Sequence, residues 1–116
     1  MGVNEGYDTE GRRESHLLPG LRLYRYTREV EYIDFGKKTT VRQQLTPNQF
    51  SVFDLLHDRN GKIPIGELKN LCWLCTPTDE TIKSTICTLN VCLASIHVPI
   101  TVTKAGGIII FSEFSV

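Results

Sequence analysis

The four cysteines of this chain are the residues whose spacing first suggests chemistry. Cys72 and Cys75 are separated by two residues, which is a spacing found in zinc ligands. Cys87 and Cys92 are five residues apart, so on a helix they diverge by about 140° and do not point toward one ion. We therefore expect reduced cysteines that act as small apolar side chains, with no bound metal and no cofactor.

No arrangement of side chains indicates an enzyme. The sequence has no local signature of a Ser/His/Asp or Cys/His catalytic set, and no glycine-rich phosphate loop. The pair Gly106-Gly107 suits a hairpin turn instead. His57 and His97 are interpreted as surface or capping residues rather than as ligands. We expect neither catalytic activity nor a small-molecule substrate.

The polar side chains between residues 83 and 90 are of the kinds that contact nucleic acid. Lysine neutralises phosphate, while hydroxyl and amide groups form hydrogen bonds with phosphates or base edges. A further lysine lies near the C-terminus, beside the expected hairpin turn. The candidate DNA-binding residues are Lys83, Ser84, Thr85, Thr88, Asn90 and Lys104.

Most of these candidates belong to a segment whose apolar residues have helical spacing. The apolar face, at i, i+4, i+7 and i+11, consists of Ile82, Ile86, Leu89 and Leu93. Thr78, or Thr76 followed by Pro77, can cap the free amides at the start. The pattern predicts a helix near residues 79–95.

An earlier segment carries a marked helix start. Thr46 suits the N-cap, Pro47 the first turn, and Gln49 completes a capping box. The apolar residues that follow predict a helix over residues 47–57, and Gly61 ends it in a left-handed conformation.

A shorter helix is expected over residues 65–73, around Leu68, Leu71 and Cys72. Two short helices and a longer third one have the layout of a helix-turn-helix.

Alternating apolar and aromatic residues before residue 45 predict antiparallel strands, with a turn at residues 34–38, and a hairpin is expected at 100–111. The predicted organisation is a mobile tail at 1–19 and one domain at 20–116, divided into strands at 20–44, a helical core at 45–97 and a hairpin at 98–116.

At 116 residues the chain has room for one domain. No apolar run approaches the roughly 20 residues of a membrane-spanning helix, and the N-terminus lacks the apolar segment of a signal peptide. We therefore expect a cytoplasmic protein that does not associate with a membrane.

These motifs together resemble the winged-helix DNA-binding domain of the OmpR/PhoB and ToxR-like transcription regulators. The resemblance spans roughly residues 30 to 111 and is carried by Leu45-Thr46-Pro47-x-Gln49-Phe50, Gly61-Lys62-Ile63-Pro64-Ile65-x-Glu67-Leu68, Trp73, Thr81-Ile82-x-x-x-Ile86-x-x-Leu89-x-x-x-Leu93, Ile100-Thr101-Val102 and Gly106-Gly107-Ile108-Ile109-Ile110. It implies an α+β fold: a four-stranded N-terminal antiparallel sheet, three helices and a C-terminal β-hairpin wing, with the third helix entering the major groove.

The charges depart from the family's pattern. Regulators of this type usually carry basic residues along the third helix, whereas here that helix keeps only Lys83, and Gly66 stands where an arginine is common. The 13 basic and 13 acidic residues of the chain balance, so its bulk charge does not attract nucleic acid.

Two functions therefore remain open. The first is a small stand-alone transcription regulator that binds duplex DNA weakly or with assistance, as a homodimer or beside a partner. The second is a winged helix used for protein recognition, in which the neutral third helix and the apolar run Ile108–Ile110 contact another regulator or a polymerase subunit.

Overall fold

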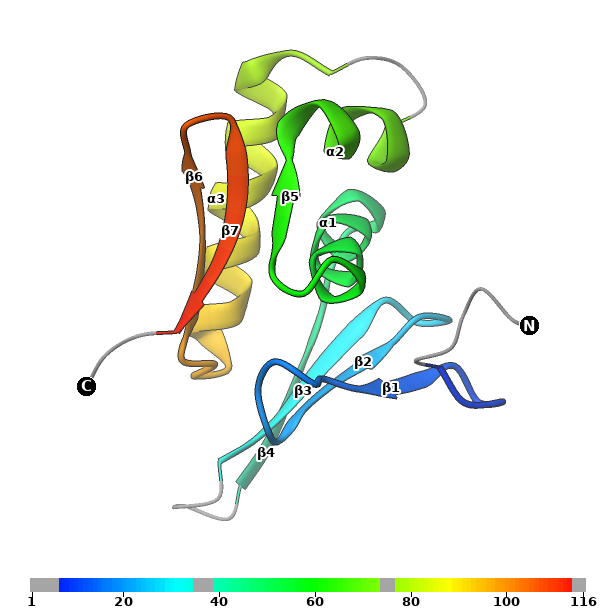
Figure 1. Cartoon of the computed structure of the whole chain (residues 1–116). Coiled ribbons are helices and arrows are strands. Elements are labelled where there is room, and N and C mark those ends of the chain that lie inside the picture. The colour runs from blue at the N-terminus through cyan, green and yellow to red at the C-terminus, as the bar shows by residue number, and fades with distance from the viewer. Residues whose placement is uncertain (1–6, 35–38, 74–76, 114–116) are drawn as a thin grey trace.

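The computed structural model describes residues 7–34, 39–73 and 77–113, which form three helices and two antiparallel sheets (Figure 1). The helices are α1 (Pro47–Asp58), α2 (Ile65–Cys72) and α3 (Asp79–Ser95). The strands are β1 (Arg12–Glu14), β2 (Leu21–Tyr24), β3 (Glu29–Asp34), β4 (Thr39–Gln44), β5 (Lys62–Pro64), β6 (Ile100–Ala105) and β7 (Ile108–Glu113). The α+β class, the three helices and the C-terminal hairpin predicted from the sequence are confirmed.

The helices begin where the sequence predicted. The Thr46 side chain accepts a hydrogen bond from the Gln49 backbone N–H, and the Gln49 side chain accepts one from the Thr46 N–H, so the capping box of α1 is complete. Thr78 caps α3 by accepting from the backbone N–H of Thr81. Gly61, just after α1, has a φ of +91° and so takes the expected left-handed conformation.

The first sheet has the strand order β1-β2-β3-β4, and β3 pairs with β4 from Asp34 opposite Thr39 onward. The turn expected at residues 34–38 lies mostly outside the described residues. The second sheet has the order β5-β7-β6, so β7 is its central strand. Its residue Ile109 is fully buried, which accounts for part of the apolar run at 108–110.

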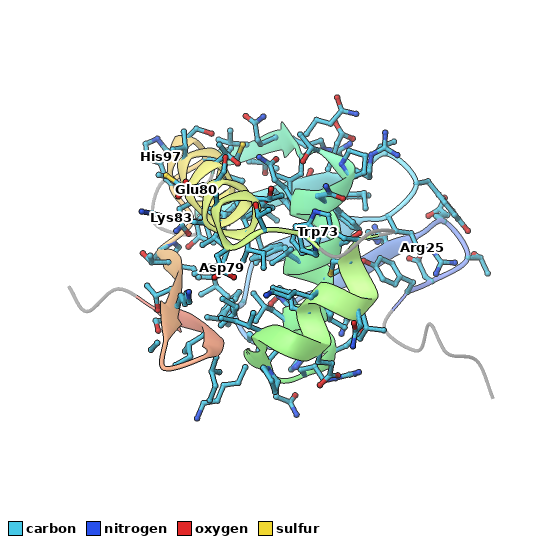
Figure 2. The ribbon with its side chains drawn as sticks, turned by 90° about the horizontal axis from the view of Figure 1, so that it is seen from above. Arg25, Trp73, Asp79, Glu80, Lys83 and His97 are labelled. Atoms are coloured by element: carbon cyan, nitrogen blue, oxygen red, sulfur yellow. The ribbon has the colours of Figure 1, made fainter. Side chains whose placement is uncertain are left out.

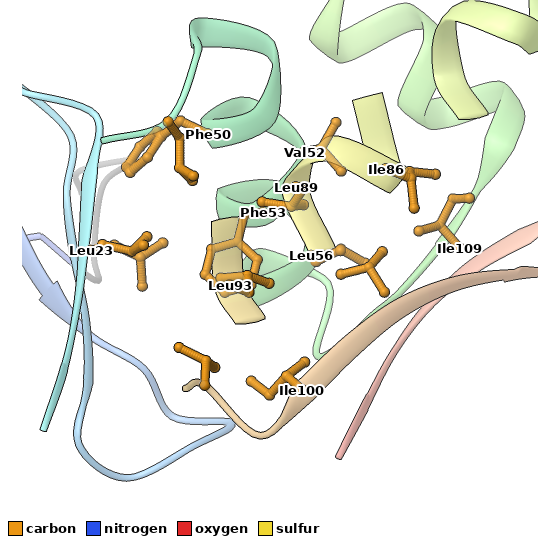
Figure 3. Packing of buried hydrophobic residues seen from close by; sticks show 14 of the residues in the cluster. Leu23, Phe50, Val52, Phe53, Leu56, Ile86, Leu89, Leu93, Ile100 and Ile109 are labelled. Atoms are coloured by element: carbon orange, nitrogen blue, oxygen red, sulfur yellow. The ribbon is translucent and has the colours of Figure 1, made fainter. Parts of the chain in front are cut away.

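One core joins the three helices to both sheets (Figure 3). The apolar stripe predicted on α3 is buried in it, opposite Phe53 and Leu56 of α1 and Ile109 of β7. Leu71, however, is 56% exposed, so α2 packs through Leu68, Cys72 and the partly buried Ile65.

The N-terminal residues correct the expectation of a tail through residue 19. Strand β1 pairs with β2, and its central residue Arg13 is only 8% exposed. The Arg13 guanidinium donates to the carboxylates of Asp54 (3.1 Å) and Asp58 (2.6 Å) on α1. The strand is short and polar, and it is held by pairing with β2 and by the contacts of Arg13 with α1, more than 40 positions away, so no local pattern marks it.

His57 also differs from its interpretation as a surface residue. It is fully buried at the end of α1, where its ring packs against Phe53 and Phe111. Its Nδ1 donates to the Phe53 carbonyl oxygen (2.9 Å), which leaves Nε2 to accept from the Ser15 hydroxyl (2.7 Å). These two hydrogen bonds are what allow an imidazole to be buried without an ionic partner.

Candidate nucleic-acid interface

Helix α3 has a buried face and an exposed face, and the residues of both recur with the same helical spacing. The residues at 82, 86, 89 and 93 are buried against the core, and a second set with the same spacing lies on the outside. That exposed stripe consists of Glu80, Ser84, Cys87 and Val91. Because the inner face is held by packing, the outer face is presented to solvent at a fixed orientation.

The β6–β7 hairpin, here called the wing, lies beside α3 (Figure 1). Asn90 fastens the two together, because its side-chain NH₂ donates to the Val102 carbonyl oxygen and its side-chain oxygen accepts from the Val102 N–H, both at 2.8 Å. Between them is a groove of about 390 Å³, lined in part by Lys83, Cys87 and Lys104. Helix and wing thus form one continuous surface.

This geometry changes the role expected of Asn90. The sequence placed Asn90 among the residues that contact DNA, but both polar atoms of its amide are engaged with the backbone of Val102. The amide keeps one further N–H and one further lone pair, but these two hydrogen bonds fix its orientation against β6. Its spacing put it on the helix, and only the pairing of the helix with β6 shows what it binds.

Thr85 and Thr88 are likewise engaged within the fold. The Thr85 hydroxyl donates to the Thr81 carbonyl oxygen (2.9 Å). The Thr88 hydroxyl donates to the Ser84 carbonyl oxygen (2.9 Å) and accepts from the Gln49 side chain on α1 (2.8 Å). Thr88 therefore lies on the α1 side of α3.

The side chains of the remaining three candidates have no partner within the described fold. Lys83, Ser84 and Lys104 are exposed, and among the described residues their side chains form no hydrogen bond or ion pair. Lys83 projects from α3 in Figure 2, beside Glu80. Lys83 and Lys104 both line the groove between helix and wing, so the structure brings the two cations to the same surface although they are far apart in sequence.

The charges around this surface are mixed. Asp79 and Glu80 occupy the first turn of α3, where carboxylates suit the positive end of the helix dipole. Asp79 also pairs with Lys69 of α2 at 3.3 Å. Elsewhere in the described chain the arginines at positions 12, 13, 22, 42 and 59 are engaged in ion pairs with carboxylates. The cations available to an anion at this surface are therefore Lys83 and Lys104.

The cysteines do not converge. Cys72 is buried in the core, where desolvation raises the pKa of its thiol to about 11, and Cys87 is exposed on α3. Cys92 is half-buried, whereas Cys75 lies outside the described residues. Among the residues that the structure describes, no group of three or more His, Cys, Asp or Glu side chains can hold a metal ion.

Three residues of the exposed stripe were absent from the candidates, namely Glu80, Cys87 and Val91. Val91 is 65% exposed, which is unusual for a valine. The signal that could have found them is the spacing of 80, 84, 87 and 91, which repeats the buried set two positions earlier along the helix.

Comparison with known proteins identifies the fold. No protein-family model and no curated protein sequence matches the chain. Among solved structures, it is similar to the DNA-binding domain of the response regulator AdeR, determined in complex with an intercistronic region. The TM-score is 0.67 at 16% identity, over 85% of this chain and 98% of that one. In the described residues no helix is long and apolar enough to cross a membrane. The chain has an OmpR/PhoB-like winged-helix fold.

Proposed function

We propose that the chain is a transcription regulator that binds duplex DNA through α3 and the wing. The observation that carries this proposal is the outer face of α3, which has no partner within the described fold and shares a groove with the wing that brings Lys83 and Lys104 together. The similar AdeR domain was solved with DNA, which supports the same use of the fold here.

In this proposal α3 lies in the major groove, which is about 12 Å wide and admits a helix. Lys83 and Lys104 contact phosphates from the two sides of the groove between α3 and the wing, and Ser84 is placed to form a hydrogen bond with a base edge or phosphate. Asn90 positions the wing, and Thr85 and Thr88 stabilise α3.

Two phosphate contacts give weak binding, because affinity for DNA comes largely from neutralised phosphates. The proposed regulator therefore acts as a homodimer or beside a DNA-bound partner, which adds the missing contacts. Two linked weak contacts bind more tightly than either alone without any new contact to the bases.

Protein recognition is the second candidate, and the exposed apolar side chains favour it. Val91 is 65% exposed on α3 and Ile108 is 38% exposed on β7. Since Ile109 is fully buried, only Ile108 of the apolar run is suited to a charge substitution that leaves the fold intact. Ile108→Glu would abolish such a contact while preserving the melting temperature.

The test is a titration of a random-sequence duplex by the intact protein at low salt, comparing wild type with Lys83→Ala, Lys104→Ala and Arg12→Ala. Each lysine substitution is expected to weaken binding about two- to fivefold for all sequences. Arg12→Ala removes the same charge from β1, the far edge of the first sheet, and should leave affinity unchanged. If the folded protein does not bind DNA, the regulator proposal fails and protein recognition takes its place.

A further inference from the structure

The C-terminal half of the exposed stripe on α3 is apolar. Cys87 and Val91 are one helical turn apart, both are exposed, and neither carries a charge or a strong hydrogen-bonding group. Ala94, also exposed, continues the same character toward the C-terminus of the helix. The surface that α3 would present to a base is therefore carbon and sulfur over about 10 Å of its length.

The base pairs of DNA differ in what they offer to such a surface. Guanine presents two acceptors in the major groove, which are read by the donors of arginine or lysine. Thymine presents a C5-methyl group, the one apolar group among the four bases, which is read by apolar side chains. Helix α3 contains no arginine, and its single lysine, Lys83, lies on the groove side near the wing.

We propose that Cys87 and Val91 read thymine methyl groups, so that the chain prefers A·T-rich sites. This rests on the proposed DNA-binding function and deepens it by naming the bases. The two side chains are separated by about 6 Å along the helix axis, which corresponds to methyl groups about two base pairs apart when the helix lies along the groove. Packing of a methyl group against an otherwise hydrated valine removes apolar surface from water, which is the source of the preference.

The experiment varies only the methyl group. Four short duplexes of matched length are compared: alternating A·T, the same duplex with deoxyuridine for thymidine, alternating G·C, and the same duplex with 5-methylcytosine for cytosine. Deoxyuridine removes the C5-methyl group, and 5-methylcytosine adds one at the equivalent place. Wild type is expected to bind A·T about fourfold more tightly than its deoxyuridine form for each methyl group contacted, and methylated G·C more tightly than unmethylated.

The variants distinguish a loss of thymine-methyl recognition from a general loss of DNA affinity. Val91→Ala should reduce the ratio between the A·T duplex and its deoxyuridine form, and Cys87→Ser should do so to a smaller extent. Leu71→Ala is the matched control: Leu71 is also an exposed apolar residue, but it lines a separate pocket with Asp54 and Asp58, and its removal should leave the ratio unchanged. Lys83→Ala should lower affinity for all four duplexes and keep the ratio.

Two results would overturn the inference, and they are distinguishable. Wild type that binds DNA with equal affinity for the A·T duplex and its deoxyuridine form rejects thymine readout and leaves the proposed function standing. Wild type that binds none of the four duplexes rejects the proposed function, and thymine readout with it.

Discussion

Asn90 shows how a residue of a type that can contact DNA can instead fasten the wing to α3. Its amide makes two hydrogen bonds to the backbone of Val102, a residue that is almost completely buried. Removing the amide leaves a buried N–H and a buried C=O without partners, which is costly because neither regains water. The consequence for function is indirect, since the wing loses its attachment to α3.

We therefore predict that Asn90→Ala lowers the free energy of unfolding by about 1–3 kcal/mol, measured by urea denaturation. The control is Ser84→Ala on the same helix, whose side chain is exposed and has no partner among the described residues, and which should change stability by less than about 0.5 kcal/mol. Equal stabilities for the two variants would contradict the structural role of Asn90.

His57 gives the molecule a defined dependence of stability on pH. Burial lowers the pKa of His57 from its ordinary value of 6.5 to about 4, although its hydrogen bond to the Phe53 carbonyl acts in the opposite direction. The charged and titratable groups that face it are Arg13 and His16 from the N-terminal segment and Asp58 from α1. Between pH 6.5 and 4 the unfolded chain binds a proton at this histidine and the folded chain does not.

The free energy of unfolding should therefore fall as the pH drops through this window, by at most roughly 3 kcal/mol from His57, and level off below pH 4. Burial raises the pKa of Asp54, which acts in the opposite sense because the folded state then binds its proton first. The carboxylates contribute equally to the pH dependence of wild type and of His57→Gln, so the difference between the two proteins isolates the contribution of His57. A pH slope that is the same in both proteins would show that His57 does not titrate as its burial requires.

At the scale of the element, α3 is fixed by its buried stripe and presents the opposite stripe to solvent. Ile86→Ala or Leu89→Ala removes side chains from the core and is expected to cost about 2–5 kcal/mol of stability. Val91→Ala removes a side chain from the exposed stripe of the same helix and should cost less than about 0.5 kcal/mol. Thermal or urea unfolding of the three variants measures the contrast, and similar values on both faces would reverse the assignment.

The elements that the sequence predicted are those with local signals. The capping box at Thr46 and Gln49, the cap at Thr78 and the periodicity of α3 all lie within one helical turn or one repeat, so they can be read without knowing the fold. Strands β1 and β5 have three residues each, and each exists through pairing with β2 and β7 respectively. A strand shorter than two periods of alternation carries no signal of its own.

The candidate DNA-binding residues stay predictions, but the structure shows which of them are exposed and which are engaged within the fold. Periodicity identifies which side chains share a helix, and residue type identifies which can bind DNA. Of the residues chosen in this way, Lys83, Ser84 and Lys104 are exposed and have no partner in the described fold. Which hydroxyl or amide is already engaged depends on what packs beside it: Gln49 for Thr88, and Val102 for Asn90. These partners come from α1 and β6, and no rule of spacing within α3 reveals them.

The whole molecule explains how a chain without net charge can still present unpaired cations on one surface. Ion pairs at the N-terminal sheet and α1 engage several arginines, such as Arg13 with Asp54 and Arg42 with Glu31. Those basic residues stabilise the fold and add little to the field at α3. Net charge is thus a poor guide to the interface, and the count of unpaired cations on the surface shared by α3 and the wing is a better one.

The number of these cations determines the salt dependence expected of DNA binding. Each phosphate neutralised by a cation releases counterions and contributes about −0.9 to the slope of log K against log salt concentration. Lys83 and Lys104 line the surface. Lys62 of β5 is a further exposed lysine, and Lys69 of α2 would have to leave its ion pair with Asp79 to contact a phosphate. The expected slope is therefore about −2 to −4 per monomer, shallow for a protein that binds DNA strongly.

Titration of one duplex across a salt series, with wild type and the double variant Lys83→Ala/Lys104→Ala, measures the slope. The double variant should have a slope shallower by about 2, since two phosphate contacts are lost. Arg12→Ala provides the control for loss of bulk charge and should keep the wild-type slope. A dimer on DNA would double the slope per complex, so sedimentation of the bound species must accompany the titration. A steep slope that both lysine substitutions leave unchanged would place the phosphate contacts on another face of the protein.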